Sequence, residues 1–178
     1  MIVLRPWLPG DADALVAARA GSDDLATQFE PLPHAAAARR FIASTLPSEP
    51  GGRHWAVVLD GTAVGNVGLT AVDRRHDSAW VSYWLARDAR GQGLATRAVA
   101  TVARWAFADG LFRLELGHRV NNPASCRVAT AAGFRAEGVE RAKLRYGSER
   151  FDVETHARLA TDPAPEVELL DVVADASA

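Results

Sequence analysis

Residues 85–96 read Leu-Ala-Arg-Asp-Ala-Arg-Gly-Gln-Gly-Leu-Ala-Thr and connect an apolar strand pattern to a helical one. Gly91 and Gly93 allow the backbone to turn tightly and to point consecutive N–H groups outward. The start of the following helix adds further N–H groups and the positive end of the helix dipole. The stretch therefore predicts a binding pocket for an anion, and a pyrophosphate is the ligand that fits it best.

Apolar periodicity on both sides of this stretch predicts a mixed α/β (α+β) fold. Helices are expected at residues 11–20, 35–46, 93–108 and 122–132, and strands at 2–7, 54–59, 63–71, 79–85, 111–120, 134–144 and 150–159. Asp60 and Gly61 indicate a hairpin between two of these strands. The order is β-α-α-β-β-β-α-β-α-β-β, a largely antiparallel seven-stranded sheet with four helices on its faces.

The composition is that of an ordinary globular chain. Of 178 residues, 48% are hydrophobic and 24% charged, and this length and composition fit a single domain, which we expect over residues 1–160. Residues 161–178 form an acidic tail rich in Ala and Pro that we expect to fray. The net charge of −2 gives no broad basic surface for nucleic acid. The single Cys126 excludes an internal disulfide and a zinc site made of four cysteines, and no metal is expected.

No part of the sequence predicts a membrane partner. No apolar run approaches the roughly 18 residues that a membrane span requires. The N-terminal residues lack the basic start and the long apolar core of a signal peptide. We therefore expect a cytoplasmic protein.

The glycine-rich stretch and three further motifs resemble the GNAT superfamily of acyl-CoA-dependent N-acyltransferases. Residues 90–95, Arg-Gly-Gln-Gly-Leu-Ala, fit the family signature Gln/Arg-x-x-Gly-x-Gly/Ala in full. Residues 83–85 (Tyr-Trp-Leu), 122–125 (Asn-Pro-Ala-Ser) and 132–134 (Ala-Gly-Phe) are similar to the RimJ/RimL branch, whose founders acetylate the N-termini of ribosomal proteins. The likeness covers about residues 1–160.

The resemblance implies that acetyl-CoA lies where the strands at 79–85 and 111–120 separate. Backbone groups of Trp84 and Leu85 are expected to bond the pantetheine amides as an added strand does. The N–H groups of residues 91–96 are expected to hold the pyrophosphate. The implied cofactor-binding set is Trp84, Leu85, Arg90, Gly91, Gln92, Gly93, Leu94, Ala95, Thr96, Asn122 and Ser125.

The resemblance also implies a general acid. A serine at the position of Ser125 sits beside the CoA sulfur in this branch, where its hydroxyl can protonate the leaving thiolate directly or through water. The alternative is an ordinary first-turn serine that bonds its own helix. Many family members use a tyrosine at the position of Ala129, which this chain excludes. Asn122 is also the residue expected to cap the helix that begins at Pro123.

The general base is harder to assign. Some relatives place a glutamate where this chain has Gly117. Glu115 lies two residues earlier and on the same strand face, so it is a candidate base, directly or through a water relay. The alternatives are a carboxylate that pairs with Arg113 or Arg119, and deprotonation by water alone. His118 points to the opposite face and is expected to be a buried, hydrogen-bonded histidine.

Two readings of function follow. The first is acetyl-CoA-dependent transfer of an acetyl group to a primary amine, either a protein N-terminus or a small molecule, by direct attack in a ternary complex. The second is a non-catalytic acyl-CoA sensor on the same fold. Asp23, Asp24 and Glu30 lie where relatives border the acceptor groove and suit a cationic amine, and Trp84 is the tryptophan expected near that groove. Some relatives form homodimers, and the sequence leaves that question open.

Overall fold

The computed structural model describes residues 1–44, 46 and 52–173. Its helices are α1 (Ala12–Ala20), α2 (Ala35–Ser44), α3 (Leu94–Ala108) and α4 (Pro123–Ala131), with short 3₁₀ helices η1 (Pro9–Asp11), η2 (Asp23–Thr27) and η3 (Arg87–Ala89). Its strands are β1 (Ile2–Arg5), β2 (Arg53–Leu59), β3 (Thr62–Asp73), β4 (Ser78–Leu85), β5 (Arg113–Arg119), β6 (Arg135–Tyr146), β7 (Glu149–Leu159) and β8 (Asp171–Val172). The second helix was expected to reach residue 46, whereas α2 ends at Ser44; residue 45 lies outside the described residues.

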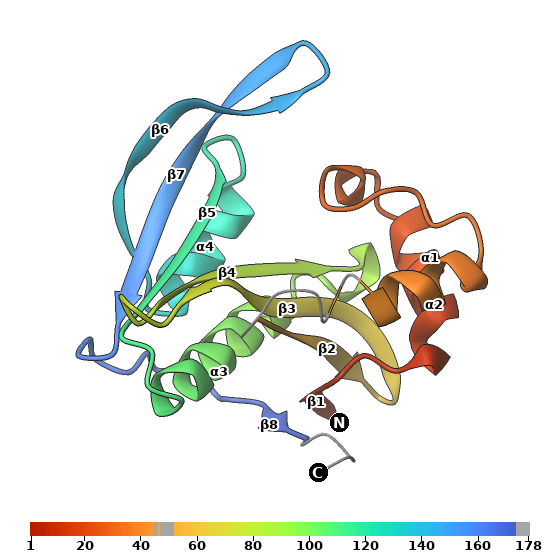
Figure 1. Ribbon diagram of the computed structural model, residues 1–178, viewed down its shortest axis with the longest axis horizontal. Coiled ribbons are helices and arrows are strands. Elements are labelled where there is room, and N and C mark those ends of the chain that lie inside the picture. Colours follow the sequence, from red (N-terminus) through yellow and green to blue (C-terminus); the bar gives the residue numbers. More distant parts are fainter. Residues whose placement is uncertain (45, 47–51, 174–178) are drawn as a thin grey trace.

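All strands join one sheet in the order β6-β7-β5-β4-β3-β2-β1-β8 (Figure 1). Two neighbouring pairs, β4–β5 and β1–β8, are parallel, and the others are antiparallel. The predicted mixed, largely antiparallel sheet with four helices is therefore confirmed. The strand number was wrong by one, because β8 pairs with the edge strand β1 and makes eight strands.

The β4–β5 pair decides where a ligand can enter the sheet. The two strands pair at only three positions, Ser78 with Arg113, Ala79 with Leu114 and Trp80 with Glu115. Both strands continue beyond these positions, β4 to Leu85 and β5 to Arg119. The described sheet therefore opens into a fork between β4 and β5, as the resemblance implied.

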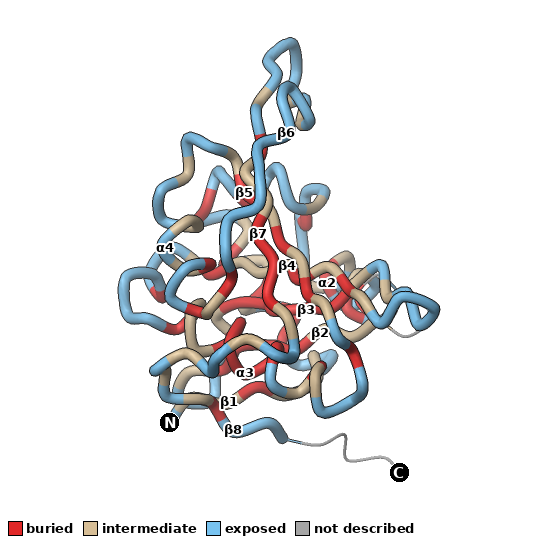
Figure 2. Tube along the Cα trace, turned by 90° about the vertical axis from the view of Figure 1, so that its left-hand side faces the viewer, coloured by how far each residue is buried: buried red, intermediate tan, exposed pale blue. Residues whose placement is uncertain are grey.

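The core lies on both faces of the central strands. Helix α3 packs on one face, where Val99 and Ala103 are fully buried against strands β2 to β5. Helices α1 and α2 form a second cluster with Trp84 on the other face. Buried positions concentrate in the central strands and α3, whereas β6 is exposed along most of its length (Figure 2). The hairpin of β6 and β7 extends away from the rest of the molecule (Figure 1).

The segment after β7 is anchored to the domain. The backbone N–H of Leu170 donates to Thr101 Oγ1 at 2.9 Å, and Arg97 of α3 donates to the Glu168 carbonyl at 3.1 Å. Leu170 is buried in the main core. We expected fraying throughout residues 161–178, but the described part of that segment crosses α3 and ends in β8.

The turn between β2 and β3 confirms the expected hairpin. Asp60 and Gly61 have φ of 48° and 85°, the left-handed values that a tight two-residue hairpin turn requires. Within the described residues, every helix is too short or too polar to cross a bilayer.

Candidate active site

A cavity of about 440 Å³ lies at the fork between β4 and β5. It is lined by the end of β4, the loop that follows, the start of α3, the first turns of α4 and part of η2. Ten predicted site residues line it: Trp84, Leu85, Arg90, Gly91, Gly93, Leu94, Ala95, Thr96, Asn122 and Ser125. The fold therefore brings the N-termini of two helices to one concave surface.

The loop before α3 has the geometry that its glycines predict. Gly91 and Gly93 have φ of 77° and 74°, a region that residues with a side chain rarely adopt. Gly93 is the N-cap of α3 and supplies no side-chain cap. The N–H groups of Leu94, Ala95 and Thr96 therefore begin the helix without an intrahelical or side-chain partner and line the cavity. Such N–H groups form a good site for a phosphate group.

Alternation along β4 decides which backbone groups face the fork. The N–H of Ala86 donates to the Val64 carbonyl at 2.8 Å, so Ala86 and, two residues earlier, Trp84 turn their backbone groups toward β3. The backbone groups of Tyr83 and Leu85 therefore point into the fork. This geometry corrects the expectation for Trp84, whose backbone belongs to the β3–β4 ladder although its side chain lines the cavity.

Arg90 joins β4 to η2 at the rim of the cavity. Its Nε and Nη2 donate to the Leu85 carbonyl at 2.9 and 2.8 Å, and Nη2 pairs with Asp24 at 3.0 Å. The Leu85 carbonyl therefore already accepts hydrogen bonds from Arg90. The backbone group of Leu85 that remains available in the fork is its N–H. Gln92, the neighbouring signature residue, turns back to donate to the Asp88 carbonyl at 3.2 Å and does not line the cavity.

Ser125 lies at the start of α4, where two contacts fix its position. Asn122 Oδ1 accepts from the Ser125 N–H at 3.2 Å, which confirms the expected N-cap. The Tyr83 hydroxyl donates to the Ser125 carbonyl at 3.4 Å. Burial raises the pKa of Tyr83, so its phenol stays protonated at neutral pH. The first turn of α4 is therefore tied to β4 beside the cavity.

Tyr83 is the site residue whose role sequence reasoning missed. Tyr83 belongs to the motif at residues 83–85, but no sequence signal indicates that its hydroxyl contacts Ser125, 42 residues later. Alternation along β4 could have indicated that Tyr83 shares a face with Leu85 and not with Trp84. Arg127 and Gln28 also line the cavity, and their sequence positions carried no signal of that.

Glu115 lies away from the cavity. It is opposite Trp80 at the last paired position of the fork, and its carboxylate accepts from Arg113 Nε at 2.7 Å. Arg113 also donates to Glu137 of β6. The structure therefore places Glu115 in the ion pair that was the alternative reading of this residue.

Gly117, the position that carries a glutamate in some relatives, has no room for a larger side chain. A Cβ at Gly117 would lie 2.9 Å from Val153 Cγ1 and 3.1 Å from the Trp80 ring. These distances are shorter than ordinary van der Waals contact. Val153 and Trp80 therefore occupy the space that a side chain at this position would need.

Near η2 the cavity is lined by the aromatic Trp84 and the acidic Asp24, and two further rings pack against Trp84 behind it. The rings of Trp7 and Phe29 lie 6.0 and 5.5 Å from that of Trp84. Asp24 lines the cavity, and its charge is paired with Arg90. Asp23 and Glu30, the other acids expected here, do not line it. One acid, and not three, therefore faces this space.

The chain is similar in sequence to known acetyltransferases. The chain matches the acetyltransferase (GNAT) domain over residues 2–135. It is 32% identical over 105 residues to the probable N-acetyltransferase YjcK of Bacillus subtilis, an alignment that covers 58% of each chain. It is 29% identical over 97 residues to the ribosomal-protein-serine acetyltransferase of Escherichia coli, covering 54% of each chain. The alignments thus span little more than half the length of these two relatives.

A solved structure extends the likeness over most of the fold. RimJ of Mycobacterium smegmatis, in complex with CoA-disulfide, superposes with a TM-score of 0.79 at 27% identity. The superposition covers 89% of this chain and 82% of RimJ.

Proposed function

The chain belongs to the GNAT acetyltransferase family, in its RimJ/RimL-type branch, and we propose that it transfers an acetyl group from acetyl-CoA to a primary amine by direct attack in a ternary complex. The observation that carries this proposal is the cavity at the fork, which is lined by the start of α3, the end of β4 and the first turns of α4. We place the reaction in the cytoplasm, as the sequence analysis expected.

The cofactor would be held mainly by backbone groups. The N–H groups of residues 91–96 would bind the pyrophosphate at the positive end of α3. Tyr83 would bond the pantetheine amides as a missing strand does, because its backbone groups face the fork, while the Leu85 N–H is left for the thioester. Arg90 would keep the end of β4 in place through its two hydrogen bonds to the Leu85 carbonyl.

The chemistry would proceed in one bound complex. The neutral amine attacks the thioester carbonyl carbon, the C–S bond breaks, and the amine proton leaves to water. The Leu85 N–H would stabilise the developing oxyanion. The Ser125 hydroxyl would protonate the CoA thiolate and recover its proton from solvent. Holding both reactants in line can supply roughly 7–11 kcal/mol of the barrier reduction.

Water is the proposed proton acceptor because Glu115 is engaged elsewhere. Its carboxylate is bound to Arg113 outside the cavity, so direct deprotonation by Glu115 would require that ion pair to open. This choice favours an acceptor that is partly neutral at physiological pH. An α-amine, with a pKa of about 8, satisfies this better than a lysine-type amine near 10.4.

A protein N-terminus is therefore the acceptor class that we propose. The name of the E. coli relative, a ribosomal-protein-serine acetyltransferase, supports the same class. The Trp84 side chain in the cavity lining and the paired Asp24 suit a peptide better than a polycation, which would need several unpaired acids.

The test combines turnover with binding. The chain is incubated with acetyl-CoA and peptides that begin with Ser, Ala or Met, with spermidine and free amino acids as competitors, and free thiol and acetylated product are measured. Ser125→Ala should lower kcat by about 100-fold while the KM for acetyl-CoA changes little. Ser148→Ala, in the exposed turn between β6 and β7, serves as the control.

The outcomes separate two functions. Absence of both acetyl-CoA binding and turnover would contradict the proposal. Tight binding without transfer to any amine would favour the acyl-CoA sensor, a reading that the placement of Glu115 outside the cavity keeps open.

A further inference from the structure

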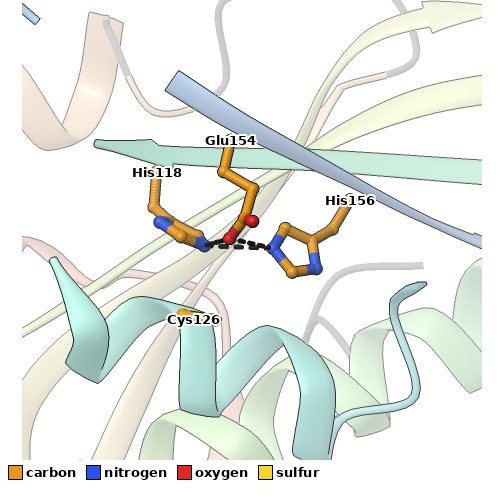
Figure 3. A group of neighbouring side chains, drawn as sticks. All are labelled: His118, Cys126, Glu154 and His156. Atoms are coloured by element: carbon orange, nitrogen blue, oxygen red, sulfur yellow. Dashed lines mark hydrogen bonds and ion pairs between the residues drawn. The ribbon is translucent and has the colours of Figure 1, made fainter. Parts of the chain in front are cut away.

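A group of four potential metal ligands lies between the sheet and α4, outside the cavity. His118 comes from β5, Glu154 and His156 come from β7, and Cys126 comes from α4 (Figure 3). Both histidines are buried, with 7% and 2% of their surface exposed. Their four ligand atoms lie within 4.8 Å of one another. The arrangement brings β7 against β5 and α4, two elements that follow one another in the sequence.

The outer nitrogens of both imidazoles are fixed as donors. His118 Nδ1 lies 3.0 Å from the Arg119 carbonyl oxygen, and His156 Nδ1 lies 3.4 Å from that of Phe134. A carbonyl oxygen only accepts, so each Nδ1 carries the hydrogen. In the neutral rings, both Nε2 atoms then have lone pairs and no hydrogen.

These two lone pairs converge on each other and on a carboxylate. The Nε2 atoms of His118 and His156 are 3.1 Å apart, and Glu154 Oε2 lies 3.3 and 3.1 Å from them. Three acceptors at these distances repel one another unless a cation lies among them. That cation is either an extra proton on one ring or a metal ion.

The distances fit a metal. A tetrahedral ion with bonds of 2.0–2.1 Å to nitrogen and oxygen separates its ligand atoms by about 3.3 Å. The three observed separations of 3.1–3.3 Å are close to this value. A backbone carbonyl on the second ring nitrogen is also the usual outer contact of a metal-bound histidine. The Cys126 thiol approaches from the α4 side, with its sulfur within 4.8 Å of the other three ligand atoms, and would move inward to about 3.6 Å from them to fill the fourth corner.

We propose that His118, Cys126, Glu154 and His156 bind one Zn²⁺ ion in a closed, structural site. A mixed set of imidazole, thiolate and carboxylate suits zinc, and four protein ligands leave no position for substrate. The ion would replace the proton of the thiol and join α4 to β5 and β7. Because Cys126 follows Ser125, it would also fix the first turn of α4 beside the cavity.

This inference differs from the expectation of no metal. A single cysteine cannot form a site of four cysteines, and the site proposed here needs only one. The ligands found here are spread over 39 positions of the sequence, from His118 to His156, in a spacing that matches no short motif. Cys126 is partly buried, and its sulfur lies beside this group.

The test uses the full chain without an affinity tag, stripped with a chelator, desalted and titrated with Zn²⁺. We expect one zinc per chain and a rise in Tm of about 5–10 °C when the metal exceeds its Kd by about 100-fold. Co²⁺ in place of Zn²⁺ should give strong visible bands of a tetrahedral site and a near-ultraviolet charge-transfer band from the thiolate.

Variants make the inference falsifiable without any assay of acetyl transfer. Cys126→Ser should fold, lose the charge-transfer band and lose most of the Tm rise. Glu154→Gln should weaken binding and keep the band. His76→Gln, which removes an exposed histidine elsewhere, should bind as the parent does. An unchanged Tm with and without Zn²⁺ would show a proton-sharing cluster, and equal binding by Cys126→Ser and the parent would show that the thiol is not a ligand. Either result would overturn the inference.

Discussion

Gly91 and Gly93 illustrate how single residues fix the cavity. Both adopt left-handed φ values, and a Cβ added at either would meet no atom within 4 Å. Substitution therefore acts on backbone strain and not on steric contact. This separation makes the loop a clean place to test whether its conformation matters for binding.

We predict that Gly93→Ala destabilises the fold by about 1–2 kcal/mol, the cost of a left-handed residue with a side chain. The strain should lower Tm by about 2–8 °C and weaken acetyl-CoA binding, because Gly93 orients the first N–H groups of α3. Calorimetric titration and thermal unfolding would measure both effects. Gly138→Ala is the matched control, since a Cβ there also meets nothing and its φ is not left-handed. Equal affinity in the two variants would contradict the prediction.

We predict that Asn122→Ala costs about 1 kcal/mol of stability, because the Ser125 N–H loses its cap. Tm should fall by about 2–4 °C, as measured by circular dichroism. Asn122→Ser keeps a capping oxygen and should retain most of that stability. If the alanine and serine variants melted together, the contact would not be stabilising the helix.

The ion pairs of Arg113 link elements across the sheet. Arg113 of β5 bonds Glu115 on its own strand and Glu137 on β6, on the far side of β7. Glu137 lies where the β6–β7 register shifts. Its hydrogen bonds with Arg113 hold the pKa of Glu137 below its ordinary value of 4.5. The carboxylate is therefore bound more strongly when ionised.

We predict a pH-dependent contribution from this pair. A lowered folded-state pKa stabilises the fold above the unfolded pKa, and the gain disappears as the pH falls through the folded value. Glu137→Gln should therefore lower Tm at pH 7, by a small amount because the pair is partly exposed, and should match the parent in strong acid. Glu149→Gln, at the start of β7, controls for loss of one negative charge. A difference that grew on acidification would have the wrong sign.

Most helices and strands could be predicted from the sequence. Seven strands and four helices follow from apolar periodicity and turn residues, because these signals are local. Strand β8 was missed, since only two of its residues pair and the Ala, Pro and acidic residues around them obscured Leu170 and its apolar neighbours. The burial of Leu170 depends on α3, more than 60 residues away in the chain, which no local pattern reveals.

The candidate site also combines features that local sequence predicts with contacts that it does not. The glycine loop and the Asn122 cap are local features and were predicted from adjacent residues. The contacts of Tyr83 with Ser125 and of Glu115 with Arg113 depend on strand register and side-chain orientation. The spacing of two residues predicts that Glu115 shares a strand face with Gly117, and this is correct. The spacing does not reveal that Val153 and Trp80 pack against that face.

At the scale of the whole molecule, the fork divides the sheet into two parts. Strands β1 to β4, with β8, lie on one side and β5 to β7 on the other, and only three residue pairs join β4 to β5. Helix α3 follows the first part and α4 follows β5. A ligand bound in the fork would therefore contact both parts and bridge them, which a ligand elsewhere would not do.

We predict that acetyl-CoA at about 100 times its Kd stabilises the chain by about 2.7 kcal/mol, which raises Tm by roughly 5–10 °C. The same binding should slow hydrogen exchange at β4, at the loop and start of α3, and at the start of α4, because these segments border the cavity on both sides of the fork. Pantetheine without the diphosphate should protect β4 but not the start of α3, since the helix N-terminus recognises the phosphates. Strands β1 and β8, at the far edge of the sheet, should change little and serve as the internal control. Protection confined to one side of the fork, or a Tm unaffected by saturating acetyl-CoA, would show that the ligand does not bridge the two parts of the sheet.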